Sequence, residues 1–229
     1  NVIDYHRLKL ITDFFSPGHE VKIIEDAAQS FGASYQGTPS GKLGDASILS
    51  FDPTKNLPNY GNGGAIVTYN RQLIEFARDQ ISNGKHLKHS DVGTNSRMSE
   101  VDCAQMMIKT KYIDQWQRRR AEISGYWVDR LKNTKVRSLI DQRNISDHCF
   151  HKFVIDVDKR DQLQKDLAVR NIETKVHYAE PLQELPAFQE YHGPNMLGAS
   201  YALSRRVLSL PIYPELTDLE VEYIIDSVI

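Results

Sequence analysis

Three short segments in the first third of the chain have the length and apolar character of β-strands, at residues 21–25, 46–51 and 64–68. The first predicts a short buried strand, and Asp26 follows it directly. Ligands of open α/β sheets bind at the carboxyl ends of the strands. The pattern therefore predicts an α/β fold with Asp26 at a ligand-binding edge.

Lys55 lies in the loop between the second and third of these segments. The third is entered through Gly61-Asn62-Gly63-Gly64, whose glycines permit backbone angles closed to other residues. A lysine amine attacks a carbonyl only when neutral, so a Schiff-base lysine needs a site that lowers its pKa. Most lysines are simply solvated surface charges.

Pyridoxal phosphate makes three demands on a protein: a carboxylate for its pyridinium nitrogen, donors for its phosphate, and a lysine for its aldehyde. Residues of all three types occur between Asp26 and Asn95. A Schiff-base function for Lys55 follows from this ordered combination.

Several sequence motifs carry a family resemblance. They are IEDAAQSFGA at residues 24–33, GD at 44–45, SF at 50–51, PTKNL at 53–57, GNGGAIVT at 61–68, GTNSRM at 93–98, VHY at 176–178 and LSLPIYP at 208–214. Together they resemble the DegT/DnrJ/EryC1/StrS sugar aminotransferases over nearly the whole chain. The resemblance implies the pyridoxal-phosphate-dependent transferase fold type I, that of aspartate aminotransferase.

The resemblance also implies roles for single residues. Lys55 resembles the lysine that binds the cofactor aldehyde and then moves the proton during transamination. Asp26 resembles the carboxylate paired with the pyridinium nitrogen, which keeps the ring an electron sink. Gln29 resembles the side chain beside the phenolic oxygen, and Ser50 resembles a phosphate-binding hydroxyl.

Three further residues resemble positions near the substrate or the partner subunit, and Arg97, like the basic segments at 85–89 and 118–120, is a candidate because of its charge. Asn95 resembles a residue that reaches the phosphate from the neighbouring subunit, which implies a homodimer with a shared active site. His177 and Tyr178 resemble a pair that lines the sugar-nucleotide pocket, and Arg97 is a candidate for a substrate phosphate. Without the resemblance, Asn95 would be a loop asparagine, and His177 and Tyr178 a strand end.

The implied function is transfer of an amino group from an amino acid, usually glutamate in this family, to a nucleotide-linked keto sugar. Such amino sugars commonly enter surface polysaccharides or glycosylated antibiotics. One alternative is a pyridoxal-phosphate-dependent sugar dehydratase, but in the family that activity goes with histidine in place of Lys55. The other alternative is a non-catalytic regulatory or interaction relative, against which Lys55, Asp26, Gln29 and Ser50 together argue.

Hydrophobic spacing predicts helices over residues 4–15, 71–82 and 101–131. From residue 133 we expect strands alternating with helices, at 148–157, 160–170, 174–178 and 218–228. We therefore expect part of a large domain with a mixed or mostly parallel sheet over residues 1–115, and a smaller α+β domain over 116–229. For the buried side of the long helix we expect Met106, Met107, Tyr112, Ile113, Trp116, Ile123 and Trp127.

Composition excludes several classes of protein. The 28 basic and 30 acidic residues give a net charge of -2, so nothing indicates a nucleic-acid partner. No run of about 18 apolar residues predicts a membrane span. Two cysteines without Cys-x-x-Cys spacing indicate no disulfide framework and favour the cytoplasm. His86 and His89 lack a carboxylate or cysteine to complete a metal site, so we predict no metal.

Family members have a longer segment before the strand that leads to Asp26. It contains a phosphate-gripping turn and a residue that stacks on the cofactor ring. We therefore expect this chain to lack the N-terminal part of a complete enzyme, and the 229 residues alone to show weak activity or none.

Overall fold

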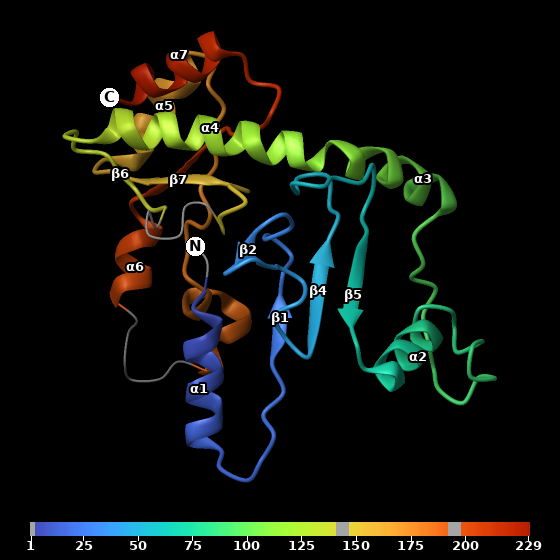
Figure 1. The fold of residues 1–229 in the computed structure, drawn as a ribbon. Helices are drawn as coiled ribbons and strands as arrows, with labels where there is room; N and C mark the ends of the chain where they lie inside the picture. The colour runs from blue at the N-terminus through green and yellow to red at the C-terminus, as the bar shows by residue number, and fades with distance from the viewer. Residues whose placement is uncertain (1–2, 141–146, 192–197) are drawn as a thin grey trace. The chain divides into compact units, whose positions relative to one another are not determined.

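The computed structural model describes residues 3–140, 147–191 and 198–229 (Figure 1). The chain divides into two compact units. One comprises residues 1–117 and 143–151, and the other comprises residues 118–142 and 152–229.

The first unit is built around a mixed three-stranded sheet in the order β1-β4-β5 (Figure 1). β1 pairs parallel with β4, and β4 pairs antiparallel with β5. This arrangement agrees with the mixed sheet of the predicted fold class. The elements of this unit are α1 (Tyr5–Phe15), β1 (Ile24–Asp26), β2 (Ser34–Tyr35), β3 (Thr38–Pro39), β4 (Ala46–Ser50), β5 (Gly64–Thr68), α2 (Arg71–Gln80), α3 (Glu100–Lys109), η1 (Thr110–Tyr112) and the start of α4 (Ile113–Leu131).

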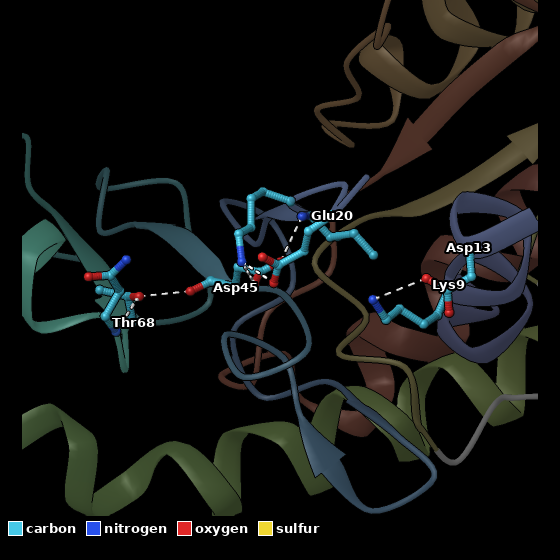
Figure 2. Close-up of polar contacts among 8 residues, drawn as sticks. Lys9, Asp13, Glu20, Asp45 and Thr68 are labelled. Carbon is cyan, nitrogen blue, oxygen red and sulfur yellow. Dashed lines mark hydrogen bonds and ion pairs between the residues drawn. The ribbon is translucent and has the colours of Figure 1, made fainter. Parts of the chain in front are cut away.

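Asp45, directly before β4, connects all three strands of this sheet (Figure 2). Its Oδ2 accepts the Ile23 N–H at 2.9 Å, and its carbonyl accepts the Thr68 hydroxyl at 2.7 Å. The Ile23 N–H and then the nearby Lys22 ammonium hold the pKa of Asp45 below its ordinary value. A charged Asp45 therefore fixes the register at this end of the sheet.

Glu25, in the middle of β1, binds the loop that leads into β4. Its carboxylate accepts hydrogen bonds from Ser40 Oγ at 2.7 Å, Gly41 N at 2.8 Å, Leu43 N at 3.2 Å and Ser47 Oγ at 2.9 Å. Alternate side chains of a strand point to opposite faces of the sheet. One face of β1 therefore carries the Glu25 hydrogen bonds, and the other carries Asp26.

The face of the sheet that carries Asp26 is open. Ile24 is 70% exposed and Ile66 is 52% exposed, and Ile48 between them is also exposed. The strand predicted over residues 21–25 is thus present as β1, but the expectation that it is buried is wrong. The reason is that the described residues cover only the face of the sheet on which Glu25 lies.

The second unit has an antiparallel sheet in the order β6-β7-β8. Its helices α4, α5 and α7 lie on one side of this sheet (Figure 1). Besides most of α4, the unit contains β6 (Arg137–Ser138), β7 (Phe153–Asp156), α5 (Arg160–Val169), η3 (Leu182–Glu184), η4 (Pro186–Tyr191), α6 (Gly198–Ser204), β8 (Val207–Leu210) and α7 (Asp218–Val228).

Trp127 is the centre of the core of the second unit. It is fully buried, and its ring meets that of Phe153 edge to face with centroids 5.0 Å apart. Its Nε1 donates to the Val221 carbonyl at 2.9 Å, so the indole joins α4 to both β7 and α7. A buried tryptophan needs such a partner for its N–H.

Most predicted helices are confirmed. α1 and α2 match the helices predicted over residues 4–15 and 71–82, and α5 and α7 match those over 160–170 and 218–228. Side chains cap several N-termini: Asp4 accepts the Arg7 N–H at 3.0 Å, and Thr217 and Glu220 form a capping box on α7. These caps satisfy backbone N–H groups that have no partner within a helix.

The single helix predicted over residues 101–131 is wrong, because η1 interrupts it between α3 and α4. The Thr110 hydroxyl donates to the Met107 carbonyl at 2.9 Å. Such local bonds from threonine compete with the helical pattern and bend helices. Of the residues expected on the buried side, Met106, Ile123 and Trp127 are buried, Ile113 and Trp116 are half-buried, and Met107 and Tyr112 are exposed.

One predicted strand is shorter than expected, and another is reduced to a single bridge. Of residues 148–157, only 153–156 form a strand, because Phe150 has a φ of 48° and donates its N–H to His148 Nδ1 at 2.8 Å. That bond closes a turn before β7. Residues 174–178 form no strand: only Lys175 pairs, with Ser209, in an isolated bridge.

No helix in the described part of the chain combines the length and the apolar character needed to cross a membrane.

The role of Glu25 can be tested by two substitutions of graded severity. Glu25→Ala leaves the Gly41 and Leu43 N–H groups without their acceptor and should lower the free energy of unfolding by about 3 kcal/mol. Glu25→Gln keeps one oxygen for these donors and can donate to Ser40, so about 1 kcal/mol is expected. Urea denaturation measures both.

Glu20→Gln is the matched control, because Glu20 is exposed and, among the described residues, pairs only with Lys22. It should change the free energy of unfolding little. Equal effects at positions 20 and 25 would show that the Glu25 hydrogen bonds do not hold the loop.

Candidate functional site

Asp26 and Ser50 lie on the same face of the first sheet, at the carboxyl ends of two neighbouring parallel strands. Asp26 pairs with Ile48, and Ser50 ends β4 two residues later. Residues two apart on a strand share a face. Of the two, the strand pattern of the sequence had placed only Asp26 at the sheet edge where ligands bind.

The Asp26 carboxylate is exposed and only partly engaged. Its Oδ1 accepts the Ala28 N–H at 3.1 Å, and within the described residues its Oδ2 accepts no hydrogen bond. The carboxylate can therefore accept a hydrogen bond from a ligand.

Lys55 lies in the loop between β4 and β5, five residues after Ser50. Its side chain is half-buried, and its backbone N–H donates to the Asp52 carbonyl at 2.9 Å. Within the described parts of the chain its ammonium group makes no hydrogen bond or ion pair. The backbone of Lys55 is thus held in a turn, and its side chain forms no ion pair with a carboxylate of the described residues.

Ser50 and Asp52 shape the start of this loop. The Ser50 hydroxyl accepts the Asp52 N–H at 3.3 Å, which leaves the hydroxyl proton to donate elsewhere. Hydrogen bonds from the Thr54 hydroxyl and N–H hold the pKa of Asp52 below its usual value, and the charge of Lys55 adds to this effect.

Gln29 lies in the turn that follows Asp26, and its side chain is exposed. Two residues distant in sequence fix this turn. Cys149 Sγ donates to the Gln29 carbonyl at 3.2 Å, and Gln117 Nε2 donates to the Phe31 carbonyl at 3.0 Å. Gly32 has a φ of 88°, and a Cβ there would lie 2.0 Å from Gln117 Nε2. Only glycine allows this close approach.

The glycines before β5 have a different role from the one expected. Among residues 61–64 no glycine has a positive φ. A Cβ on Gly64 would instead lie 2.7 Å from the Leu49 carbonyl oxygen, and one on Gly63 would lie 2.9 Å from Met98 Sδ. These glycines are needed because neighbouring atoms approach closely, so the prediction of unusual backbone angles is wrong.

Asn95 and Arg97 lie in the loop between α2 and α3, and both side chains are exposed. Asn95 forms an isolated β-bridge with Ser82. The loop is further held by the buried Asp79, whose Oδ1 accepts the Leu87 N–H at 2.7 Å. The backbone of this loop is therefore ordered while the two predicted side chains point to solvent.

His177 and Tyr178 belong to the second unit. His177 Nδ1 hydrogen-bonds Ser209 Oγ at 2.9 Å, and its ring meets that of Tyr178 edge to face. Partial burial, followed by the charges of Lys152 and Lys175, lowers the pKa of His177. This shift favours the neutral form of His177, while Tyr178 is exposed.

Two buried asparagines beside Lys55 were not predicted. Asn56 is 5% exposed and Asn59 is 2% exposed. Asn56 Nδ2 donates to the Cys149 carbonyl at 2.7 Å, and Asn59 Oδ1 accepts a hydrogen bond from Gln105. The only sequence signal is the two asparagines that flank Leu57 and Pro58 in this loop.

The two histidines of the possible metal pair have structural partners. His86 pairs with Glu75, and His89 Nδ1 lies 3.0 Å from the Asn83 carbonyl. Within the described residues no three histidine, cysteine or acidic side chains converge on a metal position. Cys103 and Cys149 are free thiols, the first exposed and the second buried.

Comparisons with known proteins agree on one family. Residues 11–229 match the model of the DegT/DnrJ/EryC1/StrS aminotransferase family. A dTDP-3-amino-3,6-dideoxy-alpha-D-galactopyranose transaminase of Aneurinibacillus thermoaerophilus is 37% identical over 92% of this chain and 58% of its own length. A "pleiotropic regulatory protein" of Geobacillus stearothermophilus is 34% identical with the same coverage. The chain thus spans less than two thirds of these relatives.

Solved structures show the same fold. DesV from S. venezuelae, crystallised in complex with a ketimine intermediate, superposes with a TM-score of 0.90 at 32% identity. The match covers 100% of this chain and 61% of DesV. A DegT/DnrJ/EryC1/StrS aminotransferase from Brucella abortus gives a TM-score of 0.89 at 28% identity.

His148 should make the first unit sensitive to acid. Burial lowers its pKa from 6.5 to about 4, and its Nδ1 accepts the Phe150 N–H only while it is unprotonated. Between these two values the unfolded chain binds a proton that the folded chain does not, so stability falls as the pH falls through this window. In His148→Gln, the slope of the unfolding free energy against pH should decrease by an amount that corresponds to up to about one bound proton.

Urea denaturation at several pH values between about 4.5 and 8 tests this. Above about pH 7 the two proteins should give parallel curves, which serves as the internal control. Parallel curves over the whole range would contradict the role of His148.

Proposed function

Because this chain belongs to the DegT/DnrJ/EryC1/StrS aminotransferase family, we propose that the full-length protein transfers an amino group from an amino acid to a nucleotide-linked keto sugar. One observation carries the proposal. Asp26 and Ser50 share a sheet face at the carboxyl ends of β1 and β4, and Lys55 follows Ser50 by five residues.

Pyridoxal phosphate is the cofactor of this family, and the groups at this site fit it. The free Oδ2 of Asp26 suits the pyridinium N–H, and the Ser50 hydroxyl, whose oxygen already accepts the Asp52 N–H, can donate its proton to a phosphate oxygen. The amine of Lys55, without a carboxylate partner in the described chain, suits the aldehyde. Gln29 lies in the turn directly after Asp26, where we propose that it contacts the phenolic oxygen.

Bound pyridoxal phosphate supplies an aldehyde that bonds amines and a ring that draws electrons from the carbon losing its proton. Asp26 keeps a proton on the ring nitrogen, because its negative charge favours the protonated form. Lys55 Nζ would hold the cofactor at its aldehyde. The amine of Lys55 would also move a proton between the two carbon atoms that exchange the amino group.

The names of several relatives support the substrate classes. Relatives named for dTDP-linked and UDP-linked sugars match most of this chain, and another is named a 3-oxo-glucose-6-phosphate:glutamate aminotransferase. A nucleotide-linked keto sugar is therefore the proposed acceptor and glutamate the proposed donor. His177 and Tyr178 are proposed to contact the sugar nucleotide, and Arg97 one of its phosphates.

A homodimer is part of the proposal. Asn95 and Arg97 are exposed on an ordered loop, as residues that meet a partner subunit would be. We assign Asn95 to the cofactor phosphate of the neighbouring subunit. The two free cysteines support a cytoplasmic enzyme, and its product would be an amino sugar for surface polysaccharides or glycosylated antibiotics.

The relative named as a regulatory protein supports one alternative, a regulatory module of the same fold. A module of this kind has no need of a lysine that bonds pyridoxal phosphate. Cofactor attachment therefore separates the two functions.

Lys55→Ala tests the central role. Wild-type protein incubated with pyridoxal phosphate should develop a visible absorption band that glutamate bleaches. Borohydride reduction should leave a pyridoxyl group on the peptide that contains Lys55. The variant should show neither, whereas Lys42→Ala, which removes an exposed lysine of the same unit, should behave as wild type. Wild-type protein without attached cofactor would favour the regulatory module.

Asp26→Asn should slow the chemistry more than it weakens cofactor binding. Loss of the charge that holds the ring proton should lower the rate of the glutamate half-reaction roughly 100-fold, by analogy with loss of one preorganised electrostatic group. The Kd for pyridoxal phosphate should change by less than about tenfold, because one hydrogen bond to an exposed carboxylate is lost. Stopped-flow absorbance and equilibrium titration give the two values.

Glu25→Gln is the matched control, since it makes the same acid-to-amide change one residue earlier on the opposite face. It should lower stability and leave the half-reaction rate of the folded protein unchanged. Equal rate losses at positions 25 and 26 would contradict the assignment of Asp26.

A further inference from the structure

One attachment of the loop that carries Lys55 to the rest of the first unit is the next residue, Asn56. Its carboxamide is 5% exposed, and its Nδ2 donates to the Cys149 carbonyl at 2.7 Å. Because a backbone carbonyl only accepts hydrogen bonds, the amide orientation is defined. The Oδ1 of Asn56 then lies 3.3 Å from His151 Nδ1, and Nδ2 lies 3.4 Å from Gln117 Oε1.

The same partners hold the turn that follows Asp26. Cys149 donates its thiol to the Gln29 carbonyl at 3.2 Å, and Gln117 donates its amide to the Phe31 carbonyl at 3.0 Å. Cys149 and Gln117 therefore each contact both the loop of Lys55 and the turn of Gln29. Asn56 is the residue through which the loop joins these contacts.

We propose that Asn56 is a positioning residue that holds Lys55 in a fixed place relative to the turn of Asp26 and Gln29. The inference rests on the proposed function for its catalytic consequence, but the contacts that carry it are independent of any cofactor. A lysine on a surface loop would sample many positions, and the buried carboxamide beside it restricts the backbone to one.

The consequence for the proposed reaction is geometric. The amine of Lys55 must bond the cofactor at one end while Asp26 binds the ring at the other. Displacements of about 1 Å in such arrangements can cost a hundredfold in rate. Asn56 therefore acts on the rate through Lys55, without touching substrate or cofactor itself.

Hydrogen exchange of the full-length protein without cofactor tests the positioning directly. Asn56→Ala removes the hydrogen bond to the Cys149 carbonyl and frees the loop. Amides in residues 51–63 and 27–33 should then exchange about tenfold faster, as expected when a buried hydrogen bond is lost.

Trp127→Phe is the matched control. It also removes one buried side-chain N–H that donates to a backbone carbonyl, that of Val221, but it does so in the second unit. Exchange in residues 51–63 and 27–33 should stay at the wild-type rate in this variant. Unchanged exchange of these segments in Asn56→Ala, or equal acceleration in both variants, would overturn the proposal.

The glutamate half-reaction supplies the second readout. In Asn56→Ala, pyridoxal phosphate should still attach to Lys55, while the half-reaction slows by about 10- to 100-fold. Trp127→Phe should keep the wild-type rate, although its Tm should fall by as much as that of Asn56→Ala or by more. A rate loss in Asn56→Ala no greater than in the control would show a merely structural role and overturn the proposal.

Gln117→Ala keeps the test decisive if Asn56→Ala does not fold. Gln117 is half-buried, and its removal breaks the bond to Phe31 and the weaker one to Asn56. Exchange in residues 27–33 and 51–63 should accelerate by a smaller factor, and wild-type exchange would overturn the proposal. Wild-type protein that attaches no pyridoxal phosphate would refute the proposed function, while the exchange experiment still decides whether Asn56 holds the loop.

Discussion

The Glu25 carboxylate accepts four hydrogen bonds from the loop that leads into β4, and the arrangement of the first unit depends on them. Two of the donors are backbone N–H groups, which need an acceptor once they are shielded from water. By holding this loop against one face of the sheet, Glu25 leaves the other face open for Asp26. The residue beside the carboxylate that we propose binds the cofactor is therefore structural, although the two look equivalent in sequence.

Polar groups in the interior also fix the loop of Lys55. Asn56 and Asn59 are both buried, and each forms its hydrogen bonds with a different part of the unit. Lys109 adds a bond from its ammonium to the Pro58 carbonyl at 2.8 Å. Apolar packing alone would tolerate sliding, whereas directed hydrogen bonds define one position. A loop without regular structure can thus present an amine as reproducibly as a strand.

Periodicity and turn residues predicted α1, α2, α5 and α7, because each has an apolar stripe or a clear stop. The strand pattern also predicted that Asp26 lies at the carboxyl end of a strand. It could not predict that Glu25 is half-buried and Asn56 buried, because their partners lie 15 or more residues away in sequence. The break at Thr110 depends on a hydroxyl contact that competes with helix, and tertiary context decides that competition.

The order of the two acids in β1 has a consequence of its own. A shift of β1 by one residue along β4 would turn Asp26 toward the loop and Glu25 toward the open face. Bonds on either side prevent it: Ile23 N–H binds Asp45, and Ala27 N–H binds the Ile48 carbonyl at 2.9 Å. Exchanging the two residues would preserve charge and composition. It would, however, place the shorter aspartate on the face that binds the loop and the longer glutamate on the open face. The order Glu-Asp therefore determines which carboxylate lies on which face of the sheet, and a one-residue insertion in β1 would exchange the two faces.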